Sequence, residues 1–412
     1  MKKYVNILML TLIANVHMAE AQTLDDYLME AAENNPGLKA GYLEFEAALQ
    51  KSAQVQAIPD LALSFGYFVS PVETRVGPQR AKFSLVQMFP WFGTNGTKVD
   101  ASEFNAQAKY HEFLDRKNEL YYRVKKAYHP ILELKEHIRW QKENLEILNT
   151  YKRLSTTNFS NGKGAMADVI RVDIMIDNAT TEIQLLQDRL RPLQVAFNRL
   201  LNRPDSIQVV VQESSVIRPV DNHFSIDSVI ANNPRLQAIE FNIQAANAME
   251  ETAGKQGLPT FGVGFDYVVV DKRTDPADVP DNGKNVFMPM VTMSLPLFRK
   301  KYNASIKEAQ WTHSALNQKK SDVTNSLVSA CENELYKIRK NLKLLELYDV
   351  QIQKTKQAID LLYSAYSNSG NDFEEVLRME QQLLKYNMSR ATAVKDFSIA
   401  EARLDYLTAK SN

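Results

Sequence analysis

The residues of this chain that could do chemistry are few and scattered. His129 and His137 are eight residues apart, near one face of a predicted helix, and could bind a metal ion together with copies from other chains. The same spacing is also that of a polar, solvated helix face. The other histidines of the chain body are isolated from them: His111, His223 and His313. No set of nucleophile, base and acid converges, so we predict neither an enzyme, nor a cofactor, nor a resident metal site.

Two short segments remain as candidates for a working site. Gly162, Lys163 and Gly164 lack the preceding strand, the spacing and the Ser/Thr of a phosphate-binding loop, so they predict the turn of a helical hairpin. An acidic cluster of Asp372, Glu374 and Glu375 complements the dipole of a helix start, which is its simplest interpretation. Three copies of this cluster converging on an axis would instead repel one another and favour cations, as in a channel gate.

These two segments are copies of one another. Residues 159–172 and 366–379 share a Ser-Asn pair, a valine and an arginine at matching positions. Long, apolar-periodic segments enter and leave each copy, which predicts two helical hairpins and an internal repeat. The matching residues are Ser160, Asn161, Val169 and Arg171 in the first copy and Ser367, Asn368, Val376 and Arg378 in the second.

Composition narrows the class of protein. The 412 residues are 44% apolar and 24% charged with no net charge, which indicates an ordered protein and gives no electrostatic reason to expect a nucleic acid partner. The only cysteine, Cys331, excludes an internal disulfide. Lys2 and Lys3, an apolar run and a small-residue cleavage site predict a secretory signal peptide over residues 1–21, without a cysteine for lipidation.

The repeat predicts the same order of elements twice, in residues 22–215 and 216–412. Each copy has a helix, two strands, a long helix, a tip and a return helix, and a connector follows the first copy. In the first copy we predict strands at 59–70 and 81–90, a polar loop at 70–80, a long helix at 98–157, a tip at 158–165, a return helix at 166–202 and a connector with a short strand at 209–211. In the second copy we predict strands at 259–270 and 286–296, a long helix at 302–366, a tip at 367–372 and a return helix at 373–409.

The strands indicate a membrane. They are about ten residues long with one apolar and one small or polar face, as in bilayer-spanning barrels. Four strands cannot close a barrel, and open edges cannot remain in lipid, so other copies must supply the rest. The small residues on one face favour a lumen and hence a trimer with twelve strands. Aromatic residues at the strand ends suit a membrane interface: Phe89, Trp91 and Phe298. The alternative is a soluble sheet with one buried face.

The chain resembles the TolC-like outer membrane efflux channels over its whole mature length. The resemblance is carried by the doubled layout, both Asn-Pro-x-Leu helix starts, both strand pairs, and tips of the form Gly-x(n)-Asp/Glu-Val-Leu/Ile. It implies a mostly helical fold with a β membrane part. Three chains would form a twelve-stranded outer membrane barrel, continuous with a helical periplasmic tunnel. The run from Val86 to Gly93 looks more like the metal-cation efflux subgroup of this family than like the drug or protein exporters.

The resemblance also implies roles for the tips. They would dock a periplasmic adaptor and an inner membrane pump of the RND type, and hold the resting channel closed. The docking candidates are Gly162, Lys163, Gly164, Asp168, Val169 and Gly370. The gate candidates are Asp372, Glu374, Glu375 and Arg378; Arg378 stands where the family often has a further acid.

Two functions are therefore open. The first is the outer membrane channel of a tripartite efflux system, a passive duct driven by a partner pump and exporting metal cations. The second is a secreted or surface coiled-coil adhesion protein without a pore. The alternating strand pairs favour the channel, because a scaffold has no need of them.

Overall fold

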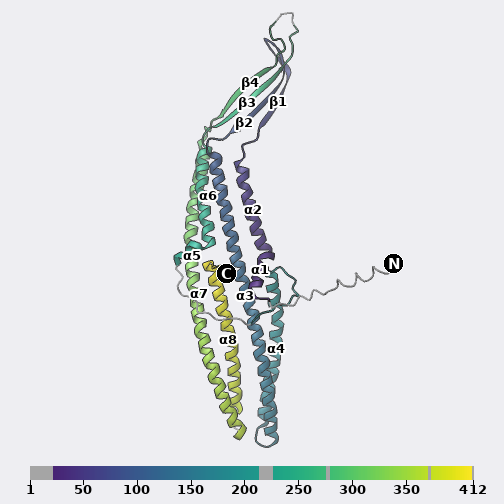
Figure 1. Ribbon diagram of the computed structural model, residues 1–412, viewed down its shortest axis with the longest axis vertical. Coiled ribbons are helices and arrows are strands. Elements are labelled where there is room, and N and C mark those ends of the chain that lie inside the picture. Colours follow the sequence, from purple (N-terminus) through teal and green to yellow (C-terminus); the bar gives the residue numbers. More distant parts are fainter. Residues whose placement is uncertain (1–21, 213–225, 275–278, 370–372, 411–412) are drawn as a thin grey trace, which may run out of the picture. The chain divides into compact units, whose positions relative to one another are not determined.

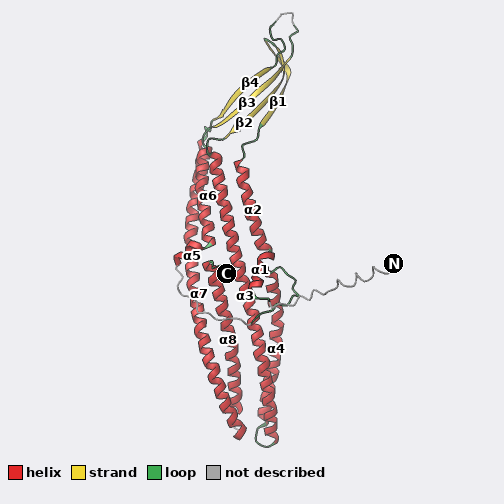
Figure 2. Ribbon diagram, viewed as in Figure 1, coloured by secondary structure: helices red, strands yellow, loops and turns green. Residues whose placement is uncertain are grey.

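The computed structural model describes residues 22–212, 226–274, 279–369 and 373–410, so the predicted signal peptide lies outside the described residues. The chain is mostly helical, with a four-stranded sheet (Figures 1 and 2). It divides into two compact units, described separately below. The first unit is formed by Met1–Lys39, Arg116–Val229 and Leu327–Asn412, and the second by Ala40–Asp115 and Ile230–Ser326. None of the described helices is long and apolar enough to cross a membrane.

The first unit consists of long helices. The C-terminal part of α3 (Thr94–Ser160) runs into α4 (Met166–Leu200), and the C-terminal part of α7 (Arg299–Ser369) lies beside α8 (Phe373–Thr408) (Figure 1). The unit also holds α1 (Leu24–Asn34). Helix α1 begins with a capping box, in which the Thr23 hydroxyl accepts from the Asp26 amide at 3.2 Å and the Asp26 carboxylate accepts from the Thr23 amide at 2.7 Å.

The two Asn-Pro pairs start helices in the same way. Helix α2 (Pro36–Gln56) follows Asn35, whose side-chain oxygen accepts from the Leu38 amide at 3.0 Å. After the short α5 (Ile226–Asn232), α6 (Pro234–Gln256) follows Asn233, whose side chain accepts from the amides of Arg235 and Leu236. An asparagine cap before a proline in the first turn satisfies amides that a helix leaves unpaired.

The sheet lies in the second unit and is antiparallel, in the order β1-β2-β3-β4. Its strands are β1 (Ala62–Thr74), β2 (Gly77–Phe89), β3 (Thr260–Val270) and β4 (Val286–Ser294). The middle pair joins the two sequence repeats, with Leu85 opposite Phe265 and Val86 opposite Gly264. One face is apolar and exposed, and the other has the small residues, so the alternation predicted from the sequence is confirmed.

The first hairpin differs from the prediction. Strand β1 begins at Ala62 instead of 59 and runs on to Thr74, and β2 begins at Gly77 instead of 81, so the predicted loop at 70–80 is a tight turn. Pro71 lies within β1, which is possible because β1 is an edge strand with a register irregularity between Tyr67 and Val72. The same reason explains Pro289 in β4, the other edge.

Other element boundaries also differ from the predicted ones. Helix α3 begins four residues before the predicted start at 98, and α7 begins three residues before the predicted start at 302. Each helix ends three residues after its predicted end. Helix α7 therefore extends into the segment predicted as the second tip, 367–372. Helix α4 ends at Leu200 and α8 at Thr408, while β4 ends at Ser294. The predicted strand at 209–211 is wrong. Instead, the Tyr27 hydroxyl bonds to both the amide and the carbonyl of Val210 at 3.1 Å, so a side chain satisfies this backbone.

Candidate functional site

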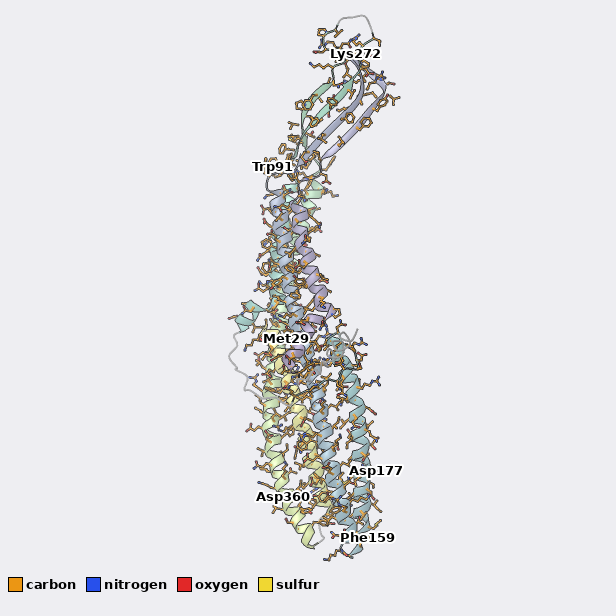
Figure 3. The ribbon with its side chains drawn as sticks, turned by 45° about the vertical axis from the view of Figure 1, so that its right-hand side comes forward. Met29, Trp91, Phe159, Asp177, Lys272 and Asp360 are labelled. Carbon is orange, nitrogen blue, oxygen red and sulfur yellow. The ribbon has the colours of Figure 1, made fainter. Side chains whose placement is uncertain are left out.

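The turn of the first tip is a glycine-terminated helix end. The Lys163 amide donates to the Asn158 carbonyl at 2.9 Å and the Gly162 amide donates to the Phe159 carbonyl at 3.0 Å. This is the Schellman pattern, in which the residue after the cap takes a left-handed conformation. Gly162 has φ +71°, which a side chain disfavours. Figure 3 labels Phe159 beside this turn. The predicted hairpin turn at 162–164 is thus observed, and Lys163 is exposed on it.

An ion-pair cluster joins the starts of the two return helices. On α4, Arg171 lies 3.8 Å from the Asp168 carboxylate one turn earlier and 3.2 Å from the Glu374 carboxylate on α8. On α8, Arg378 pairs with Glu375 one turn earlier. Asp168 and Glu375 occupy matching positions of the repeat, as do Arg171 and Arg378. Glu374 and Glu375 are therefore paired with arginines from both copies.

The valines that follow these acids are buried. Val376 is fully buried and Val169 is 7% exposed. Val376 packs in a cluster to which α3, α4, α7 and α8 all contribute, with Tyr366 and Phe373 stacked at 4.7 Å between ring centroids. The two tips thus share one apolar core, which the separate sequence copies did not indicate. The predicted candidates Gly370 and Asp372 lie outside the described residues.

A polar pair lies beside this core. The Tyr151 hydroxyl on α3 donates to the Glu380 carboxylate on α8 at 2.9 Å, and both side chains are buried. Burial raises the pKa of Glu380, the Tyr151 hydrogen bond opposes this, and the carboxylates of Asp360 and Glu143 raise it further; the net shift is upward. Burial likewise raises the pKa of Tyr151, which stays a hydrogen-bond donor.

The two predicted histidines have different surroundings within the chain. His129 is buried, and burial and then the nearby charge of Lys125 lower its pKa to about 4. The Nε2 atom of His137 lies 3.1 Å from the Met388 carbonyl, which fixes this ring on a neighbouring helix. Among the described residues, no group of three or more His, Cys, Asp or Glu is placed to hold a metal ion.

The predicted interface aromatics gather where the strands meet the helices of the second unit. Phe89 ends β2, and Phe298 directly precedes α7 and is 87% exposed. Trp91 packs on Phe261 at the start of β3, with 5.6 Å between ring centroids. Figure 3 labels Trp91 at this end of the sheet and Lys272 at the other.

The sequence prediction did not include three residues of the tip region: Arg171, Tyr151 and Glu380. Arg171 was visible as the repeat partner of Arg378, and an arginine three residues after an acid in both copies was a usable signal. Tyr151 and Glu380 carry no such signal, because they are 229 residues apart and meet only when the two copies pack.

A comparison with protein family models decides what this architecture is. The model described as outer membrane efflux protein matches residues 27–203 and 225–410, one match in each copy. The chain belongs to the outer membrane efflux protein family. This family consists of export channels and not of enzymes, and its members lie in the outer membrane. The resemblance to the TolC-like outer membrane efflux channels is therefore confirmed.

Solved structures show the same fold. The outer membrane protein VceC from Vibrio cholerae is 15% identical with a TM-score of 0.74, covering 93% of this chain and 95% of that one. CusC is 14% identical with a TM-score of 0.78, covering 94% and 92%. The outer membrane channel MtrE from Neisseria gonorrhoeae, solved in its open state, is 16% identical with a TM-score of 0.71, covering 93% and 88%. No curated protein sequence matches this chain.

Proposed function

We propose that this outer membrane efflux protein is the exit duct of a tripartite efflux system. It would form a homotrimer whose strands close a barrel and whose helical tips dock a periplasmic adaptor and an inner membrane pump of the RND type. The observation that carries this proposal is the sheet, which has an exposed apolar face and two edges without partner strands among the described residues.

The sheet supports assembly in lipid. Leu63, Phe65, Tyr67 and Val69 alternate along β1 and are 63% or more exposed, with Val69 at 90%. A soluble monomer has no use for such a face. Strands β1 and β4 are the two edges, and an unpaired edge in lipid costs several kcal/mol per group. Pairing β4 of one copy with β1 of the next removes both edges, and three copies of four strands give twelve.

The first unit also has exposed helix faces that suit packing against neighbouring copies of the chain. Met166, Ile170 and Ile174 repeat every four residues on α4 and are about half exposed. On α7 a second exposed row contains Tyr336, Leu347, Val350 and Leu361, and it is interrupted by the exposed Lys340, Lys343 and Lys354. Apolar rows at these spacings are typical of helices that pack side by side. In the proposed trimer, the α4 row of one copy packs on the α7 row of the next.

The tips have separate proposed roles. Gly162, Lys163 and Gly164 form the docking turn together with Asp168, and the burial of Val169 gives it a packing role inside this surface. Glu374, Glu375 and Arg378 belong to the gate, but the ion pairs change its nature. Because Arg171 pairs with Glu374 and Arg378 pairs with Glu375, these two acids of the gate must separate from their arginines before they can act as free carboxylates. Gly370 and Asp372 keep their proposed docking and gate roles.

Metal cations are the proposed cargo, and this part rests on the sequence run from Val86 to Gly93. It is tested by deleting the gene and comparing growth on copper, silver, zinc and cobalt salts with growth on drugs. Equal sensitivity of mutant and wild type to every metal, with increased sensitivity to drugs, would assign the cargo to drugs instead.

The channel itself is tested on the full chain purified in detergent. We expect a trimer by light scattering and discrete conductance steps in planar bilayers. The adhesion alternative predicts a protein that remains soluble and monomeric without detergent and adds no conductance, and that result would end the proposal.

A further inference from the structure

Three methionines gather on the face of the sheet that carries the small residues. They come from the two strands that flank β3: Met88 on β2, and Met288 and Met290 on β4 (Figure 1). In the register, Met88 is opposite Gly262 and Met290 is opposite Gly264. Residues that are opposite one another in an antiparallel sheet share a face, and so do alternate residues of one strand. All three thioethers therefore lie on one face.

The glycines of β3 leave a trough in which these side chains can meet. Gly262 and Gly264 place no side chain between β2 and β4, which are two strand spacings, about 10 Å, apart. The Met88 sulfur lies in this trough, 2.5 Å from the position that a Cβ at Gly262 would take. The Cβ of Thr292, on β4, is 3.4 Å from the same position, and the Met290 sulfur accepts from the Thr292 hydroxyl at 4.0 Å. The sulfurs of Met88 and Met290 thus approach the trough from its two sides.

The methionines are also accessible, and hydrophobic burial does not explain them. Met288 is 47% exposed, and Met88 and Met290 are partly exposed. Along the described strands β2, β3 and β4, this face carries no Leu, Ile or aromatic residue in the rows from 82 to 88, 262 to 268 and 286 to 292. The large apolar side chains lie on the opposite face. What a methionine adds to such a surface is a polarisable sulfur.

The charges beside the methionines favour a soft ion over a hard one. Asp266, opposite Met288, is 1% exposed and forms an ion pair with Lys82. The pair has no net charge, so a hard cation such as Mg²⁺, which needs several oxygen ligands, gains little here. The Oδ1 atom of Asp266 is buried without a hydrogen-bond partner in the described part of the chain, and an ion beside Met288 would give it one. Thioether sulfur, in contrast to oxygen, prefers soft metal ions.

We propose that Met88, Met288 and Met290 bind a soft monovalent cation, Cu(I) or Ag(I), through their thioether sulfurs. Binding needs only the sheet, whereas the place of this site on the inner wall of a barrel rests on the proposed function. Met88 is the last residue but one of β2, so the site lies at the end of the sheet that adjoins the helices. An ion that arrives from the helices meets it on entering the barrel. The ion must also leave, so the site is one of weak and exchangeable binding.

The test measures binding of Ag(I) to the full chain purified in detergent, by equilibrium dialysis in chloride-free buffer. Cys331→Ala is the parent protein, because it removes the only thiol. Met88→Leu with Met290→Leu, which nearly conserves volume, should weaken binding by about tenfold or more. Binding to the parent should be the same from pH 5 to 7, because a thioether has no proton to lose, whereas histidine has one. Met293→Leu is the matched control, because Met293 lies on β4 but on the other face, opposite Phe261, and should bind as the parent does.

X-ray absorption at the silver edge adds a measurement that needs no methionine variant. Sulfur neighbours of Ag(I) in the parent can come only from methionine, because the parent has no cysteine. A shell of nitrogen and oxygen alone would overturn the site. Equal affinity of the parent and the Met88→Leu, Met290→Leu variant, or an equal loss in Met293→Leu, would also overturn it.

Conductance in planar bilayers separates failure of this site from failure of the channel. If the Met88→Leu, Met290→Leu variant loses Ag(I) while neither it nor the parent conducts, the site stands and the channel proposal fails. If both conduct and bind Ag(I) equally, the channel stands and the site fails.

Discussion

Gly162→Ala isolates the backbone contribution to the first tip. A left-handed conformation costs a residue with a side chain about 1–2 kcal/mol. No atom lies within 4 Å of the position that a Cβ at Gly162 would take, so crowding adds nothing to this cost. Alanine also lowers the conformational entropy of the opened turn, which stabilises the closed turn by about 0.4–1 kcal/mol. The net loss is then about 0.8 kcal/mol, or about fourfold in the local opening equilibrium.

The assay is hydrogen exchange at the amides of Gly162 and Lys163, whose bonds close the turn. Exchange reports local opening, which a global melting curve misses. Gly162→Asn should lose less than Gly162→Ala, because asparagine tolerates the left-handed region better. Gly96→Ala, inside α3 and also without crowding, should be neutral or stabilising. Equal exchange rates in Gly162→Ala and wild type, or a greater loss for asparagine than for alanine, would refute the assigned turn.

Three further predictions concern the ion pairs and the core. A double-mutant cycle of Arg171→Gln and Glu374→Gln should give a coupling free energy below about 1 kcal/mol that falls with added salt, because both side chains are exposed. A larger coupling free energy that does not change with salt would contradict a surface ion pair. Glu374→Ala with Glu375→Ala should change single-channel conductance or cation preference in planar bilayers, and unchanged values of both would remove these acids from the gate. Val376→Ala should cost about 2 kcal/mol at the tip, measured as faster hydrogen exchange across α8. Val169→Ala should also be destabilising, because Val169 is buried. A Val169→Ala variant that loses no stability, as expected for an exposed site, would contradict this burial.

The strands were predictable because one face of each is apolar throughout. Phe65 and Tyr67 alternate with Gly66, and this pattern survives any error in the strand ends. The ends themselves were not predictable. Pro71 and the polar residues after it are typical of a loop, and the register irregularity between Tyr67 and Val72, together with the edge position of β1 within the chain, explains how Pro71 remains in a strand.

The helices followed from apolar periodicity, and their caps could be predicted from Thr23 and the two Asn-Pro pairs. The contacts between the two copies could not. A repeat indicates that two hairpins exist, but it carries no information on whether α3 packs against α8. The contact between Arg171 and Glu374 and the bond between Tyr151 and Glu380 both depend on that packing.

The two copies differ at their tips in a way that has a physical consequence. Both keep an acid, a buried valine and an arginine at matching positions, so both return helices start with the same kind of ion pair and a buried valine. The copies differ in the residues before the helix starts, where Gly162-Lys163-Gly164 stands against Ser369-Gly370-Asn371, and at Ala167, which stands against Glu374. A partner protein that distinguishes the copies must then recognise residues 162–164, residues 369–371 or Glu374, because the other residues of the helix starts present nearly the same chemistry. Exchanging residues 162–164 with residues 369–371, and Ala167 with Glu374, should therefore exchange the docking preference and leave Val169 and Val376 buried.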